Sequence, residues 1–361
     1  MNAPIQPDQE RHVAGPPPKQ PLFGRIRISG AWWLAVFVLL VTVAAACFHL
    51  ITARVLNAEF KYTTDNGSIT ITGYTGRADT VIIPRAINGL PVTGIGDYAF
   101  QDCTNLTSVT IPRSVTNIGY HAFRDCSSLV SAVIPNSVTS IDGMAYRGTK
   151  LARVTIPASV AYIGNDVFDG CSSLIAISVD TMNLAYSSLD GVLFDKERTM
   201  LIRCPGGRTG AYTIPASVTE IDDSAFDSCC NLTGVTIPQS VTSIGESAFY
   251  GCTGLTSITI PAGLTSIQNW EFCNCTSLTN VTIPDSVTNI GRDAFCDCTS
   301  LRTVVIPNGV KTIGEGAFFG CTNLTHLTIP QNVAIGTEAV PAETKIVRVT
   351  NSARLRRHER R

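Results

Sequence analysis

Charged and aromatic residues are both scarce in this chain of 361 residues. Asp, Glu, Lys and Arg together make up 15% of the sequence, and Phe, Trp and Tyr make up 7%. Long amphipathic helices need a charged face, so this composition disfavours them. Gly, Pro, Ser and Thr are plentiful instead, and they favour short strands joined by turns.

The sequence also lacks any arrangement of residues that is typical of catalysis. Its five histidines are scattered, no Ser-His-Asp or Cys-His pattern is present, and there is no glycine-rich phosphate loop. The Asp residues fall at variable positions of the pattern described below, as on a solvated face. We therefore expect no enzyme, no catalytic residue and no cofactor.

Charge is unevenly distributed along the chain. Residues 1–58 carry five Lys and Arg against two acidic residues, and residues 345–361 carry seven against one. Residues 59–344 are left with 15 basic and 25 acidic residues. Such an acidic body repels phosphate backbones, so we expect no binding to nucleic acid. The basic tail is either a solvated chain end or a contact for anionic lipid or polymer.

Residues 31–51 carry no formal charge and are long enough, as a helix, to span about 30 Å, the thickness of a bilayer core. Lys19, Arg25 and Arg27 precede them, which predicts a cytoplasmic N-terminus and export of the rest. The segment is a retained transmembrane anchor, a cleaved signal, or a lipidation site at Cys47. The chain is then held in the cell envelope or secreted after cleavage. Residues 1–30, rich in proline, are predicted to be disordered.

An Ile-Pro pair recurs through most of the chain. The intervals between successive prolines are 23, 22, 58, and then 23 five times, for Pro112, Pro135, Pro157, Pro215, Pro238, Pro261, Pro284, Pro307 and Pro330. One such unit cannot bury its own apolar side chains, but stacked units cover one another. The period therefore predicts a solenoid of about ten coils.

Each position of the repeat has a physical role. Val281-x-Ile283 alternates as a half-buried strand does, and Val287-x-x-Ile290 predicts a second short strand. Gly291 and its equivalents are expected to adopt positive φ. The following Ala-Phe predicts a short helical turn whose aromatic ring fills the coil. The expected fold is thus mostly β with short helical turns.

The ends and one interruption depart from the period. Residues 59–83 predict a capping hairpin, turning at Asp65-Asn66-Gly67, and a first strand. The solenoid is expected over residues 84–335, with an insertion at about 180–210 whose hairpin, residues 191–203, projects from the stack. Residues 336–361 are predicted to form a C-terminal cap and the basic tail.

Eight of the 13 cysteines share one phase of the repeat: Cys103, Cys126, Cys171, Cys229, Cys252, Cys275, Cys298 and Cys321. We interpret them as a ladder of small buried side chains and not as a redox or metal array. Cys273 and Cys296 share another phase in adjacent coils, where a disulfide across the stack is possible. The cysteine side chains of the two phases should point in different directions, so their thiols would not converge on one ion. We therefore predict no metal site.

One residue of each strand should point outward, between two inward ones. The candidate ligand-binding residues at this position are Thr110, Thr155, Ser178, Thr236, Thr259, Thr282 and Thr328. They predict a recognition face for a protein or glycan partner, since solenoids offer extended surfaces. Thr also suits exposed strands by itself, so the ladder can equally be structural. The hairpin at residues 191–203 is a second candidate surface.

The repeat, C-x2-L-x2-V-x-I-P-x-S-V-x2-I-G-x2-A-F, resembles that of BspA-type leucine-rich-repeat proteins over about residues 60–335. The stretches YTTDNGSITITGYTG and DGVLF…LIRCPGG resemble features of the same family, whereas Tyr146 and Thr149 depart from its unit. The resemblance implies a leucine-rich-repeat solenoid and a bacterial cell-surface or secreted protein that binds or adheres without catalysis. The alternative is a structural envelope protein that associates with itself.

Overall fold

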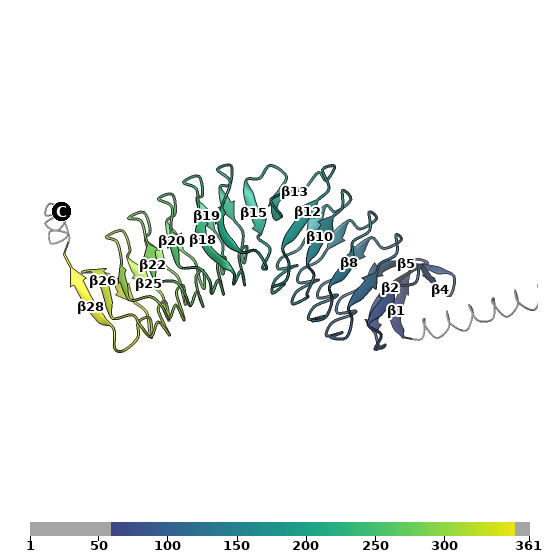
Figure 1. Ribbon diagram of the computed structural model, residues 1–361, viewed down its shortest axis with the longest axis horizontal. Helices are drawn as coiled ribbons and strands as arrows, with labels where there is room; N and C mark the ends of the chain where they lie inside the picture. The colour runs from purple at the N-terminus through teal and green to yellow at the C-terminus, as the bar shows by residue number, and fades with distance from the viewer. Residues whose placement is uncertain (1–58, 351–361) are drawn as a thin grey trace, which may run out of the picture. The chain divides into compact units, whose positions relative to one another are not determined.

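The computed structural model describes residues 59–350 (Figure 1). Every described residue belongs to one compact unit of the chain. The predicted disordered segment at 1–30, the apolar segment at 31–51 and the arginines of the tail lie outside the described residues. Within residues 59–350, no helix is long and apolar enough to cross a membrane.

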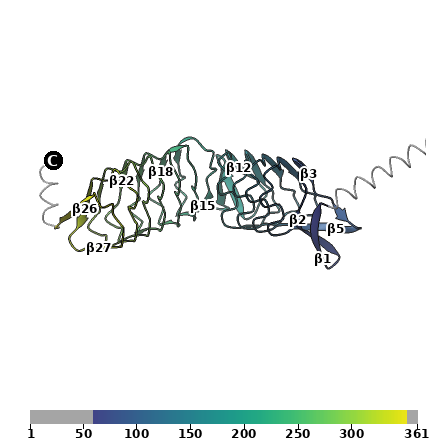
Figure 2. The ribbon, with the colours of Figure 1, turned by 90° about the horizontal axis from the view of Figure 1, so that it is seen from below.

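The described residues form a mostly-β solenoid in which coil follows coil from β1 to β28 (Figures 1 and 2). The first strand of each coil carries the outward residue. These first strands are β3 (Thr80–Ile82), β6 (Ser108–Thr110), β8 (Ser131–Val133), β10 (Arg153–Ile156), β12 (Ala176–Val179), β16 (Gly210–Thr213), β18 (Leu232–Thr236), β20 (Ser257–Thr259), β22 (Asn280–Thr282), β24 (Thr303–Val305), β26 (His326–Pro330) and β28 (Lys345–Val349).

The second strand of each coil follows the Ile-Pro bend and pairs in parallel with its neighbours. These strands are β5 (Leu90–Ile95), β7 (Asn117–Ile118), β9 (Ser140–Ile141), β11 (Tyr162–Ile163), β17 (Glu220–Ile221), β19 (Ser243–Ile244), β21 (Ser266–Ile267), β23 (Asn289–Ile290), β25 (Thr312–Ile313) and β27 (Ala334–Ile335). Inward side chains are thus mostly covered by the same residue type of the next coil, although β19 and β21 belong to different sheets.

The predicted short helical turns are wrong, because the part of the chain that the structure describes contains turns and strands but no helix. In the first coil Ala99 N–H donates to the Gly96 carbonyl, whereas Phe100 N–H donates across to Ala122 of the next coil. A helix would direct every N–H along its own axis. Here alternate N–H groups join neighbouring coils instead.

The glycines of the Ile-Gly phase do not have positive φ, which corrects a second expectation. The left-handed residue lies two positions later, for example at His121 (φ 56) and Asp293 (φ 51). The glycine is needed because coils approach closely. A Cβ on Gly164 would lie 2.4 Å from the backbone nitrogen of Gly143 in the preceding coil.

Two hydrophobic cores run through the solenoid. One extends from Phe60 to Ile177, and the other extends from Val192 to Ala339. Aromatic rings stack along each of them, with 5.0 Å between the centroids of Phe100 and Phe123. In the second core, the ring centroids of Phe295 and Phe318 lie 5.3 Å apart in the same kind of stack. The stack is broken between Phe168 and Phe226, where the insertion lies.

The N-terminal end is capped by the hairpin of β1 (Phe60–Asp65) and β2 (Ser68–Tyr74). Asn66 and Gly67 form its two-residue turn with φ values of 47° and 76°, as a hairpin of matching twist requires. β2 pairs in parallel with β5, and β4 (Ala86–Ile87) adds a short antiparallel edge. At the other end β28 pairs with β26.

The insertion folds into the stack and does not project from it. It contains β13 (Tyr186–Leu189), β14 (Val192–Asp195) and β15 (Met200–Arg203), and β15 pairs in parallel with β17. Val192, Leu193 and Phe194 are fully buried. The sequence-based expectation was wrong because three consecutive residues of β14 are buried, whereas an exposed hairpin would bury alternate ones.

Candidate functional site

The candidate ligand-binding positions form an in-register ladder of outward side chains. Thr155 lies opposite Ser178, Thr259 opposite Thr282, and Val305 opposite Thr328. Six of the seven candidates are exposed, and Thr328 is half-buried. Ile82, Thr213 and Val347 occupy the same ladder and were missed, because their strands lie at the ends or after the insertion.

The insertion divides this ladder into two groups. Ile177 N–H donates to the Gly191 carbonyl of the insertion, so β12 is followed by inserted residues and not by β16. Thr110, Thr155 and Ser178 therefore belong to the first core, and the remaining four candidates belong to the second. Within each group the ladder spans more than one sheet, since β8 and β10 belong to different sheets, as do β18 and β20.

Hydrogen bonding separates the candidate hydroxyls from the other threonines of the repeat. Thr116 Oγ1 donates to the Thr93 carbonyl at 3.2 Å, and Thr139 Oγ1 to the Thr116 carbonyl at 3.1 Å, so these hydroxyls join coils. Among the described residues, the hydroxyls of Thr236, Thr259 and Thr282 have no hydrogen-bonding partner. Their donors and acceptors face solvent and are open to a ligand.

The cysteine ladder joins coils in the same way. All of its members except Cys103 are buried. The Cys126 thiol donates to the Phe100 carbonyl at 3.0 Å, and the Cys275 thiol to the Phe249 carbonyl at 3.2 Å. Thr149 preserves a donor at this phase, on the Tyr146 carbonyl.

Burial keeps Cys252 and Cys275 in the thiol form. It raises the pKa of Cys275 to about 12 and that of Cys252 well above its usual value. Because the thiolate is the reactive form, these two thiols are chemically inert, whereas the hydrogen bond with Cys126 lowers the pKa of the half-buried Cys103. Within residues 59–350, no group of His, Cys, Asp and Glu is arranged to hold a metal ion.

Cys273 and Cys296 form a disulfide between adjacent coils, with 4.5 Å between their Cα atoms. The pair lies in the turns that follow Phe272 and Phe295, away from the strand face. It links two coils of the second core covalently, which makes it a structural cross-link.

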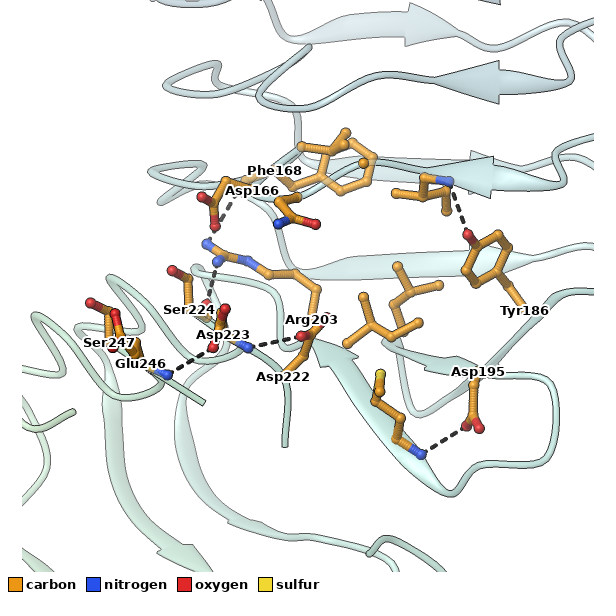
Figure 3. Close-up of a pocket in the computed structure, with 17 residues that line it drawn as sticks. Asp166, Phe168, Tyr186, Asp195, Arg203, Asp222, Asp223, Ser224, Glu246 and Ser247 are labelled. Atoms are coloured by element: carbon orange, nitrogen blue, oxygen red, sulfur yellow. Dashed lines mark hydrogen bonds between the residues drawn. The ribbon is translucent and has the colours of Figure 1, made fainter. Parts of the chain in front are cut away.

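A cleft of about 480 Å³ marks the junction between the two cores (Figure 3). It is lined by the insertion and by the coils on each side, with Asp166, Asp222 and Asp223 among its carboxylates. Sequence reasoning missed it, since its walls come from segments about 60 residues apart. Burial raises the pKa of Asp166 and of Asp222.

Arg203 crosses this junction and ties its two sides together (Figure 3). It donates to the Phe168 carbonyl at 3.3 Å on one side and to the Ser224 and Asp227 carbonyls on the other. Its guanidinium also pairs with Asp169 at 3.4 Å. Arg203 therefore adds hydrogen bonds between the two sides of the junction.

Asp169 and Asp227 interact beside Arg203. Burial and then the hydrogen bond with Asp169 raise the pKa of Asp227 to about 8, so Asp227 holds the proton. Burial opposes ionisation of Asp169, but its bond from Asp227 and the charge of Arg203 lower its pKa. The set is a buried structural network whose groups pair with one another, and within it only the Nε of Arg203 has no hydrogen-bonding partner among the described residues.

Comparison with known proteins gives a consistent result. The model of the "BspA type Leucine rich repeat region" matches six copies over residues 92–190 and 213–347. The crystal structure of a leucine-rich cell-surface protein from Faecalibacterium prausnitzii is 30% identical, covers 74% of this chain and 92% of its own, and superposes with a TM-score of 0.58. No curated protein matches the chain.

Two further crystal structures share the fold. A leucine-rich-repeat protein from Eubacterium ventriosum is 24% identical, with 81% and 94% of the two chains covered and a TM-score of 0.62. The pneumococcal vaccine antigen PcpA is 19% identical, with 82% and 93% covered and a TM-score of 0.63. Proteins of this repeat family and fold are generally non-catalytic.

Proposed function

Because the chain belongs to the BspA-type leucine-rich-repeat family, we propose that it is a non-enzymatic recognition protein that presents its strand face to a protein or glycan partner. The observation that carries this proposal is the ladder of exposed hydroxyls without partners at Thr236, Thr259 and Thr282. At other positions of the repeat, threonine hydroxyls such as those of Thr116 and Thr139 join coils, whereas these are free to bind.

The proposal places the solenoid outside the cytoplasm. The apolar residues 31–51 would direct export, and they would remain as an anchor or be removed. The similarity to a cell-surface protein of Faecalibacterium prausnitzii supports display at the cell surface. Adhesion is the role that an extended, outward-facing ladder suits.

Replacing Thr236, Thr259 and Thr282 together by Lys tests the face. The full chain is applied to an array of purified extracellular proteins and glycans. We expect the bound array members to be lost in this variant, since three long cations cover the ladder. The matched control places Lys at Ser173, Ser243 and Thr322, which are exposed on other parts of the coils. Equal binding by the two variants would reject the face.

Self-association is the alternative function, and sizing of the full chain separates it from adhesion. A recognition protein binds foreign molecules at concentrations where it stays a single species. A structural envelope protein instead grows in size as its own concentration rises, and the Lys substitutions leave the array result unchanged.

A further inference from the structure

Two hollows lie on the strand face of the first core, one on each side of Val133. The hollow between β6 and β8 has a volume of about 580 Å³, and the one between β8 and β10 has a volume of about 430 Å³. Ser131, Val133 and Asn136 line both. Val133 is 73% exposed and forms the ridge between them.

The second hollow coincides with an irregularity in the repeat. The interval from Pro135 to Pro157 is one residue shorter than the usual 23. β8 pairs with β6, but β8 and β10 belong to different sheets. Ala132 also replaces the larger Val109 and Val154 of the neighbouring coils and is only half-buried. The surface is therefore indented where the regular ladder would be flat.

Two arginines flank the hollows. Arg113 lines the first hollow and Arg153 the second, and both are exposed. Neither has an ion-pair partner among residues 59–350. Arg85 holds the same place after Ile-Pro as Arg113, one coil earlier. These cations stand out in a body with an excess of ten negative charges.

Apolar side chains lie near the arginines, and among the described residues Asp180 is the one carboxylate that lines the second hollow. Ile82 is 64% exposed and lies beside Thr110, which in turn lies beside Val133. Val130 is 54% exposed and lines the second hollow. Isolated apolar side chains on a surface are ordinary, but a set gathered around hollows is typical of an interaction site.

We infer that this arginine patch, made of Ile82, Arg113, Val133 and Arg153, binds an acidic polypeptide segment in an extended conformation. Arginine pairs with carboxylates through two parallel hydrogen bonds, which gives direction as well as affinity. The hollows beside Val133 accept the apolar side chains between the carboxylates. The inference rests on the proposed function and names the partner of one part of the strand face.

The geometry sets the length of the segment. By their places in the repeat, Arg153 begins a strand and Arg113 follows the end of another strand two coils away. From strand rise and strand spacing, the two lie on the order of 20 Å apart across Val133. An extended chain of about six residues covers that distance. A sulfated glycan would also satisfy the arginines, but it would leave the apolar walls without contacts.

The test measures binding of a fluorescent peptide of about eight alternating Glu and Leu residues to the full chain in non-ionic detergent. We expect binding that weakens roughly a hundredfold in the double variant Arg113→Glu, Arg153→Glu, at about tenfold for each lost charged contact. Arg302→Glu is the matched control, since Arg302 is exposed beside β24 in the second core and should bind normally. Val133→Asp should weaken binding without altering either arginine.

Three results would overturn the inference. One is equal affinity of the double variant and Arg302→Glu, with thermal unfolding showing that both are folded. Another is equal affinity for a Gln-Leu peptide of the same length. The third is displacement of the peptide by a heparin fragment that itself binds more tightly, which would assign the patch to sulfated glycans. In each case the array result at Thr236, Thr259 and Thr282 still decides the proposed function separately.

Discussion

At the residue scale, the repeated positions are explained by contacts with the neighbouring coil. The Cys126 thiol and the Thr116 hydroxyl both donate to carbonyls of the preceding coil. Gly164 leaves room for the backbone of that coil. A residue type that repeats in a solenoid can therefore be required by a contact between coils, and not only by the backbone conformation within one coil.

Gly164→Ala should destabilise the protein by about 1–3 kcal/mol, because its Cβ would overlap backbone atoms of Gly143. Gly234→Ala is the control, since no atom lies within 4 Å of its added Cβ. This substitution should be neutral, or it should stabilise the protein by up to about 1 kcal/mol because Ala lowers the conformational entropy of the unfolded chain. Denaturant unfolding measures both, and equal effects would contradict the close-approach explanation.

Glu271 occupies a phase where Ala248 and Ala294 stand in the adjacent coils, and it is 1% exposed. Its Oε2 accepts the Gln268 N–H at 2.7 Å, and its Oε1 has no partner among the described residues. In regular coils the equivalent N–H, as in Gly245 and Gly291, donates to an Ile carbonyl of the preceding coil. This accounts for the break between the sheets of β19 and β21.

Burial raises the pKa of Glu271 to about 8 from its usual 4.5. The folded protein therefore keeps a proton that the unfolded chain releases, so this group's contribution to stability is greatest below pH 4.5 and falls as the pH rises to about 8. In the wild type, Glu271 should lower the free energy of unfolding by up to about 1.4 kcal/mol for each pH unit in that window, and Glu271→Gln should abolish this loss. Unfolding free energies across the window test it, and parallel curves for the two proteins would refute it.

At the element scale, the insertion acts as a joint between two stacks. Its strand β14 contributes Leu193 to the first core and Phe194 to the second. Arg203 at the end of β15 supplies hydrogen bonds to both sides. The joint is therefore part apolar strand and part buried ionic network.

Arg203→Met should destabilise the protein by about 3–5 kcal/mol, because it removes the buried cation that pairs with Asp169, leaving only Arg147 as its ion-pair partner, and breaks the hydrogen bonds of Arg203 to three carbonyls. Arg302→Met, an exposed position, should change the stability by less than about 0.5 kcal/mol. Thermal unfolding compares the two variants. A loss of equal size in both would show that Arg203 does not clamp the junction.

At the scale of the whole described unit, the buried apolar side chains form two separate cores, and in a solenoid each coil contacts mainly its nearest neighbours. A local defect should therefore spread within its own core before it reaches the other. Leu278 is fully buried in the second core.

Leu278→Ala should cost about 2–5 kcal/mol and should raise amide hydrogen exchange mainly over residues 192–339. Residues 60–177 of the first core should keep nearly their original protection. Exchange measured by mass spectrometry on wild type and variant distinguishes the cores. A uniform rise across both cores would mean that the junction transmits unfolding fully.

The 23-residue period by itself determined the solenoid, its two strands per coil, the inward Phe, Leu and Cys rows and the outward Thr ladder. Each of these follows from alternation of side chains along a strand and from stacking of identical coils. The capping hairpin could also be read directly, because an Asn-Gly turn sets its own local geometry.

Only the tertiary structure decided what depends on atoms of a neighbouring coil. The role of Gly164 is a clearance from Gly143, and the role of Arg203 is a set of bonds to Phe168 and Asp227, none of them adjacent in sequence. The second hollow beside Val133 likewise arises where a short coil meets a regular one. Pattern within one coil reveals which way a side chain faces, but the atoms it meets belong to the coil beside it.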